Sequence, residues 1–147
     1  MFDQLDKYKK HGHFIFKPAD NLAAVCTAPS KCSGIYLIYA LQKGKVTLIY
    51  IGISGRKGLN GEILHRKDGL RGRFLTGKQF GALRKHTWPA KMKLENIEAL
   101  DIHWYVTYGN TNADFPGELE MKFLHQYKDI YGEPPRWNKK ITKKQTP

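Results

Sequence analysis

Two β-rich segments joined by a short polar turn constrain this sequence more than any other feature. Residues 34–41 and 46–53 are rich in β-branched and aromatic side chains, and between them lies Gln42-Lys43-Gly44-Lys45. Apolar runs of this composition on either side of a short glycine-containing turn are typical of a β-hairpin. The sequence therefore predicts two paired antiparallel strands.

Further elements follow the hairpin. Residues 55–69 are punctuated by glycine and rich in basic side chains, which predicts a loop, and Asp68 is a candidate cap for a helix that Gly72 weakens. Residues 102–108 alternate as a third strand would. A periodic segment then begins at Pro116 and continues to Ile130, ending at Gly132, and it predicts a helix.

The length of 147 residues suits one compact domain. Residues 1–32 are polar and irregular apart from an apolar patch at 13–16, and we expect an N-terminal arm or cap there. The main domain is expected at residues 33–140. Residues 141–147 have the composition of a solvated basic tail.

A large positive charge points to a polyanionic partner. Lys and Arg total 25 against 13 for Asp and Glu, a formal net charge of +12. Such a surplus in a small domain favours nucleic acid, whereas a membrane partner would need an apolar span or a basic amphipathic helix that the sequence lacks. With only Cys26 and Cys32 and no export signal, we expect free thiols and a cytoplasmic protein.

One carboxylate lies on the wrong side of the last helix. At about 100° per residue, the apolar side chains fall in an arc of roughly 140° that should face the sheet. This arc comprises Pro116, Leu119, Phe123, Leu124, Tyr127, Ile130 and Tyr131. Glu120 lies inside it, whereas Glu118 lies on the opposite face, within reach of Lys122. A carboxylate facing a core needs a partner, and Arg, a tyrosine hydroxyl, Mg²⁺ or an ordinary salt bridge would serve.

Five short motifs in order resemble the GIY-YIG nuclease superfamily. They are Gly34-Ile35-Tyr36, Tyr50-Ile51-Gly52, Leu70-Arg71-Gly72-Arg73-Phe74, Leu119-Glu120-Met121-Lys122-Phe123-Leu124 and Asn138. The resemblance implies a small α/β (α+β) sandwich, with a central three-stranded antiparallel sheet flanked by helices. It also implies cleavage of DNA phosphodiesters with one divalent cation, Mg²⁺ or Mn²⁺.

The resemblance also assigns roles. Tyr36 and Tyr50 are its two site tyrosines, of which one, Tyr36 by preference but alternatively Tyr50, orients or deprotonates the attacking water. Arg73 is expected to bind the scissile phosphate. Glu120 corresponds to the metal ligand, and Asn138 to the asparagine that braces the site. Two core tyrosines on strands and a plain turn asparagine are the alternatives.

Two matches leave a choice open. Arg71 competes with Arg73, and both fit a solvated basic face as well. The histidine often found four residues after the family's arginine is Gly77 here. His65, as a proton acceptor, and Lys78, as a phosphate contact, are candidates for its work, with an ordinary basic surface as the alternative.

Other basic side chains are candidate nucleic-acid contacts. The set is Arg56, Lys57, His65, Arg66, Lys67, Arg71, Lys78, Arg84 and Lys85. Residues 78–93 interleave cations with an aromatic side chain, and a solvated face around a buried Trp88 is an equal alternative. A zinc site formed by His11, His13, Cys26 and Cys32 has spacing that matches no common pair.

These observations favour a divalent-metal-dependent DNA endonuclease, of restriction type or of repair or recombination type, acting as a monomer or homodimer. The alternatives are a non-catalytic nucleic-acid-binding module of the same fold and an RNA nuclease or binder, because phosphate contacts do not distinguish the sugars.

Overall fold

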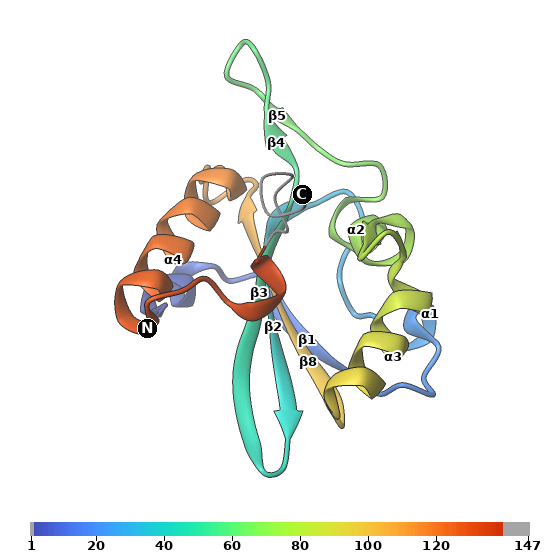
Figure 1. The fold of residues 1–147 in the computed structure, drawn as a ribbon. Coiled ribbons are helices and arrows are strands. Elements are labelled where there is room, and N and C mark those ends of the chain that lie inside the picture. The colour runs from blue at the N-terminus through green and yellow to red at the C-terminus, as the bar shows by residue number, and fades with distance from the viewer. Residues whose placement is uncertain (1, 140–147) are drawn as a thin grey trace, which may run out of the picture.

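A four-stranded antiparallel sheet forms the centre of the computed structural model, which describes residues 2–139 (Figure 1). The strands are β1 (His11–Phe16), β2 (Ser33–Gln42), β3 (Lys45–Ser54) and β8 (Ala99–Tyr108), in the order β1-β8-β2-β3. The predicted hairpin is confirmed as β2 and β3. Its turn is Lys43-Gly44, and both residues have positive φ, at 50° and 74°, as a tight two-residue turn between twisted strands requires.

The mixed α+β class is confirmed, but the sheet has one strand more than predicted. β1 pairs with β8 over six residues, with His13 opposite His103, so part of the segment expected to be an arm or cap belongs to the sheet. Its side chains alternate as an edge strand requires, because Phe14 and Phe16 are buried while His11 and His13 are exposed. A short 3-10 helix, η1 (Asp3–Lys7), precedes it.

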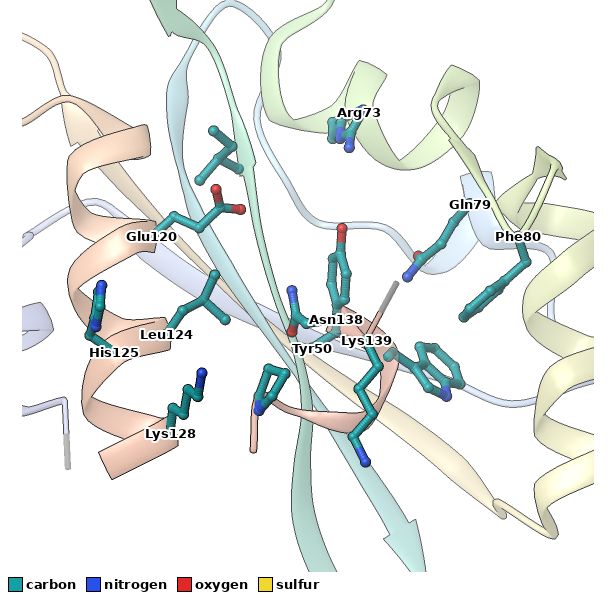
Figure 2. A pocket seen from close by; sticks show the side chains of 13 residues that line it. Tyr50, Arg73, Gln79, Phe80, Glu120, Leu124, His125, Lys128, Asn138 and Lys139 are labelled. Carbon is teal, nitrogen blue, oxygen red and sulfur yellow. The ribbon is translucent and has the colours of Figure 1, made fainter. Parts of the chain in front are cut away.

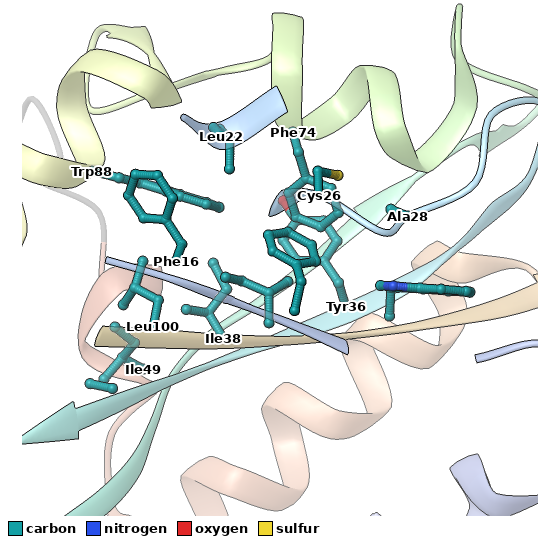
Figure 3. Close-up of a cluster of buried hydrophobic side chains, with 14 of the residues drawn as sticks. Phe16, Leu22, Cys26, Ala28, Tyr36, Ile38, Ile49, Phe74, Trp88 and Leu100 are labelled. Carbon is teal, nitrogen blue, oxygen red and sulfur yellow. The ribbon is translucent and has the colours of Figure 1, made fainter. Parts of the chain in front are cut away.

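Helices cover both faces of the sheet, and each face has its own core (Figure 1). The helix α4 (Pro116–Tyr131) packs on one face. On the other lie α1 (Leu22–Val25), α2 (Gly69–Thr76) and α3 (Arg84–Glu95), around the larger cluster that Figure 3 shows. The helix α3 was not predicted, and it buries Trp88 and Met92, so the solvated-face interpretation of residues 78–93 is correct at Trp88.

The predicted last helix is confirmed as α4, although its apolar arc is not buried throughout. Pro116 and Phe123 are buried, but Ile130 and Tyr131 at its end are each 59% exposed. Gly132 ends the helix in the left-handed conformation, with φ of 81°.

The basic loop is more ordered than predicted. Within residues 55–69, β4 (Arg56–Lys57) and β5 (Ile63–Leu64) pair as a small hairpin that projects beyond the end of the sheet (Figure 1). Asp68 stands at the N-cap of α2 in the left-handed conformation, but its side chain makes no cap hydrogen bond. A second small hairpin, β6 (Lys78–Gln79) and β7 (Ala82–Leu83), leads into α3.

A short 3-10 helix, η2 (Arg136–Asn138), ends the described chain, and the predicted basic tail at 141–147 lies outside it. None of the helices within residues 2–139 combines the length and apolar character that crossing a bilayer requires. Cys26 is buried and Cys32 half-buried, and both are free thiols as predicted.

Candidate active site

A cavity of about 800 Å³ opens beside β3, between α4, α2 and η2 (Figure 2). Four of the five predicted site residues line it, namely Tyr50, Arg73, Glu120 and Asn138. They come from four different elements that span almost ninety positions of the sequence, so only the fold brings them together. Figure 2 shows Glu120 and Arg73 on facing walls, with the Tyr50 hydroxyl directed toward the space between them.

Glu120 lies where the helical wheel predicts. It is half-buried on the face of α4 that looks toward the sheet, beside Leu124. Glu118 is 70% exposed and lies 3.9 Å from Lys57 of β4, whereas Lys122, its predicted partner, donates instead to Gln4 at 2.8 Å. The two glutamates therefore have different environments, and Glu118 interacts with Lys57, although the spacing also puts Lys122 within its reach.

The two candidate arginines make different contacts. Arg71 donates at 3.0 Å to the carbonyl oxygens of Cys26 and Ala23, so it ties α2 to the segment around α1 and does not line the cavity. Arg73, two residues later on α2, lines the cavity. Arg71 is half-buried and does not share the cavity with Arg73, and its role as a nucleic-acid contact stays a prediction.

Arg84 was predicted to contact nucleic acid at the surface, but its side chain is fully buried. Its guanidinium donates to the carbonyl oxygen of Arg73 at 2.6 Å and to the hydroxyl of Tyr36 at 3.1 Å, and it lies over the Trp88 ring at 5.9 Å. A Cβ built on Gly77 would collide with this guanidinium. Gly77 stands where the resemblance leads us to expect a histidine. The space beside Gly77 is filled by Arg84, and not by His65 or Lys78.

The two hairpin tyrosines are neighbours with different environments. Their ring centroids are 6.0 Å apart, Tyr50 lines the cavity, and Tyr36 is fully buried behind it. Burial raises the pKa of the Tyr50 hydroxyl well above its ordinary value, and the neighbouring Tyr36 adds to this. Tyr50 is therefore a neutral phenol near neutral pH. Gly52 lies against both rings, since a Cβ there would be 2.5 Å from the Tyr36 hydroxyl oxygen.

Asn138 braces the site through the backbone, as predicted. Its Oδ1 accepts from the Ile51 N–H and its Nδ2 donates to the Ile51 carbonyl oxygen, each at 2.9 Å. Ile51 is the residue between Tyr50 and Gly52. The short helix η2 that carries Asn138 is fixed in turn by Glu95 at the end of α3, which accepts from Trp137 Nε1 at 3.0 Å and Arg136 Nε at 2.7 Å.

Three arginines gather around one position. Burial lowers the pKa of Arg66, and the positive charges of Arg73 and Arg84 lower it further. Burial would lower the pKa of Arg73 too, but its interactions with the hydroxyls of Tyr36 and Tyr50 raise it above the ordinary value. Arg66 and Arg56 line a second hollow of about 500 Å³ that shares Arg73 with the first. These cations repel each other beside an open cavity, so an anion bound there would be attracted by all of them and would relieve their repulsion.

The other predicted contacts lie around this centre. Lys67, Lys78 and Lys85 are exposed, and His65 is exposed with its Nδ1 2.6 Å from Ser33 Oγ. Lys57 Nζ lies over the Phe115 ring, 4.9 Å from its centroid, so the projecting hairpin contacts the start of α4. His125 and Lys128 of α4 also line the cavity and were not predicted, because they lie among exposed polar residues of the helix.

The zinc site considered from the sequence does not form. His11 Nδ1 contacts the Tyr8 carbonyl oxygen, Cys32 Sγ accepts from Lys10, and Cys26 is buried in the core. Glu120 is, by contrast, the only carboxylate among the described residues that line the main cavity. One carboxylate in a hydrated space is a donor set that suits Mg²⁺, which keeps several of its waters.

Comparison of the chain with protein-family models, with curated proteins and with solved structures gave no match.

Proposed function

We propose that this protein is a divalent-metal-dependent endonuclease that hydrolyses DNA phosphodiester bonds, as the sequence resemblance to GIY-YIG nucleases implies. One observation carries the proposal: a carboxylate, Glu120, faces an arginine, Arg73, across a cavity that also presents the hydroxyl of Tyr50. A metal ligand, a phosphate ligand and a group able to hold water are the parts that phosphodiester hydrolysis needs.

Phosphate binding is the best-supported step. Arg66, Arg73 and Arg84 raise the positive potential around one wall, and Arg84 is buried so that it acts without contacting the substrate. A scissile phosphate beside Arg73 would relieve the mutual repulsion of these charges. The same guanidinium would stabilise the additional negative charge of the transition state, where such interactions contribute most.

Glu120 would hold the metal ion. When bound, Mg²⁺ or Mn²⁺ supplies positive charge that stabilises the leaving oxygen during in-line displacement. The contribution of the chain would be to hold the carboxylate on α4, directed into the cavity whose facing wall carries Arg73. Asn138 keeps the backbone beside Tyr50 fixed, so the opposite wall is equally rigid.

The environments of the tyrosines favour different roles for them. Tyr50 lines the cavity and remains protonated, so its hydroxyl is suited to orienting the attacking water by a hydrogen bond. Tyr36 accepts from Arg84 below the cavity, which suits it to positioning Arg73 and Tyr50. This reverses the sequence-based preference for Tyr36 as the tyrosine that contacts the water.

Long polyanions fit the surface around the cavity. The exposed cations Arg56 and Lys67, on and near the projecting hairpin, extend the positive surface away from Arg73. A duplex backbone would cross them on its way to the cavity, and release of its counterions would drive binding. We propose that the reaction occurs in the cytoplasm, where two unbonded cysteines are expected.

Cleavage of supercoiled plasmid tests the proposal. Wild type is expected to nick or linearise the plasmid with Mg²⁺ and to leave it intact with EDTA. Glu120→Gln should lower the rate by about a hundredfold or more, because it removes the metal ligand. Glu118→Gln is the matched control on the same helix, and its rate should stay close to wild type because Glu118 is 70% exposed and interacts with Lys57.

Three outcomes would contradict the assignment. The first is that the wild-type protein does not cut the plasmid. The second is that Glu120→Gln and Glu118→Gln lose activity equally, and the third is that cutting persists in EDTA. Plasmid binding without any cutting would support the non-catalytic module instead. Comparison of DNA with RNA of the same sequence, at one fixed salt concentration, tests the sugar preference, because phosphate contacts depend steeply on salt.

A further inference from the structure

A histidine pair and an aspartate lie together on the sheet, away from the candidate active site. His13 of β1 and His103 of β8 are directly opposite each other in the strand register, and their rings stack with centroids 4.9 Å apart. Asp101, two residues before His103, points to the same side of β8. His13 Nδ1 is 2.9 Å from Asp101 Oδ1, and His103 Nε2 is 3.1 Å from Asp101 Oδ2.

The three side chains present a compact ligand set. One nitrogen from each imidazole and one carboxylate oxygen all lie within 4.8 Å of one another. A tetrahedral zinc site with bonds of about 2 Å holds its ligand atoms roughly 3.3 Å apart. Modest side-chain rotation would therefore close the set around an ion, since the rigid strands already hold the three residues side by side.

The cluster is accessible from solvent without being freely mobile. The side chains of His13, His103 and Asp101 are 57%, 33% and 20% exposed. The edge of the Tyr39 ring packs against His103, with centroids 5.3 Å apart, and this contact limits the rotation of the imidazole. An open position toward solvent remains for water.

From this geometry we propose that His13, Asp101 and His103 form a second metal site, selective for a borderline transition-metal ion such as Zn²⁺. Two imidazoles and one carboxylate suit Zn²⁺, whereas Mg²⁺ prefers oxygen ligands. In the metal-free arrangement the carboxylate accepts the ring N–H protons of both histidines. On metal binding each neutral imidazole would carry its single proton on the other ring nitrogen, so that the nitrogen now facing Asp101 is free to coordinate the cation; an imidazolium would release one proton to solvent.

The site would act on the fold and not on the proposed reaction. It joins β1, at one edge of the sheet, to β8, whereas Tyr50 lies on β3 at the other edge. A bound ion would therefore link β1 to β8 and stabilise their pairing. Because the unfolded chain lacks this arrangement, metal binding would raise the unfolding temperature.

Titration of the tag-free full-length protein with ZnCl₂, followed by calorimetry, tests the proposal. Wild type is expected to bind one Zn²⁺ per chain, and CoCl₂ in its place should give a visible absorption band. His13→Asn, Asp101→Asn and His103→Asn should each weaken binding by at least about tenfold. His11→Asn is the matched control, because His11 lies on the same strand and face but contacts the Tyr8 carbonyl oxygen.

Two results would overturn the site: no saturable binding of Zn²⁺ by wild type, or binding that survives both His13→Asn and His103→Asn. If His103→Asn loses its fold through its Tyr39 contact, His13→Asn still decides, because His13 is the most exposed of the three. Thermal unfolding gives a second readout. At one fixed concentration, ZnCl₂ should raise the midpoint of wild type and of His11→Asn clearly more than that of His13→Asn.

Discussion

Gly52 offers a sharp test of how the two hairpin tyrosines are packed. A Cβ at this position would lie 2.5 Å from the Tyr36 hydroxyl oxygen and 2.6 Å from Cε2 of Tyr50. Ordinary contact between such atoms begins near 3.5 Å, so Gly52→Ala would force the rings apart by about 1 Å. Both rings would have to move; both interact with Arg73, and Tyr50 also lines the cavity.

The expected consequences differ in size for stability and activity. Overpacking of this extent lowers the free energy of unfolding by about 1–3 kcal/mol, so the protein should still fold. A displacement of about 1 Å in a catalytic group lowers rate by roughly a hundredfold. The rate of plasmid cleavage should thus fall by far more than the small loss of unfolding free energy, measured in urea, would explain.

Gly117→Ala is the matched control. Gly117 lies in α4, and nothing approaches its added Cβ within 4 Å. The free energy of unfolding should rise by about 0.5–1 kcal/mol, as for other glycines replaced in helices, with cleavage unchanged. Wild-type cleavage by a folded Gly52→Ala variant would refute the idea that the tyrosine positions are critical.

Three further predictions concern Asn138 and Tyr50 in the cavity wall and Arg84 behind it. Asn138→Ala should lower the free energy of unfolding by about 2 kcal/mol, since two hydrogen bonds to Ile51 disappear, and a loss below about 0.5 kcal/mol in urea unfolding would contradict this. Arg84→Lys should lower cleavage at least about tenfold without weakening plasmid binding in a filter assay, because lysine keeps the charge but not the paired donors. Equal losses of binding and cleavage would place Arg84 on the substrate. Because burial raises the pKa of Tyr50, the folded state keeps a proton that the unfolded state releases, so stability should fall as pH rises above about 10. In Tyr50→Phe that fall should be smaller, as urea unfolding at several alkaline pH values would show; an identical fall would contradict the shift.

The sequence was informative where one local pattern determines one element. Segments rich in β-branched and aromatic residues around a glycine turn predicted β2 and β3, and periodicity predicted α4 with Glu120 on its inner face. These predictions were confirmed because each pattern depends only on how a single segment packs against a core. The same approach missed β1, whose six residues bury only Phe14 and Phe16 and whose pairing with β8 is a long-range event.

Tertiary context overruled the sequence at the basic residues. Eight of the nine candidate contacts are at least partly exposed, but Arg84 is fully buried, because Tyr36 and the Arg73 carbonyl oxygen supply its acceptors and Trp88 covers its face. No composition rule predicts a buried guanidinium, since its burial is stable only when its partners are already in place. The contacts of Arg71 could not be predicted for a related reason, because its acceptors are two backbone carbonyl oxygens, which a residue pattern does not show.

The position of β3 explains why the site needs Asn138. β3 is an edge strand of the sheet, so the N–H and carbonyl of Ile51 that face away from β2 have no strand to pair with. The amide of Asn138 supplies one donor and one acceptor in the geometry of a neighbouring strand, and it does so beside Tyr50. A lysine or water could cap an edge equally well, but neither would fix its backbone. A rigid amide from a distant segment therefore closes the edge beside a cavity-lining tyrosine, and the same contact ties η2 to β3.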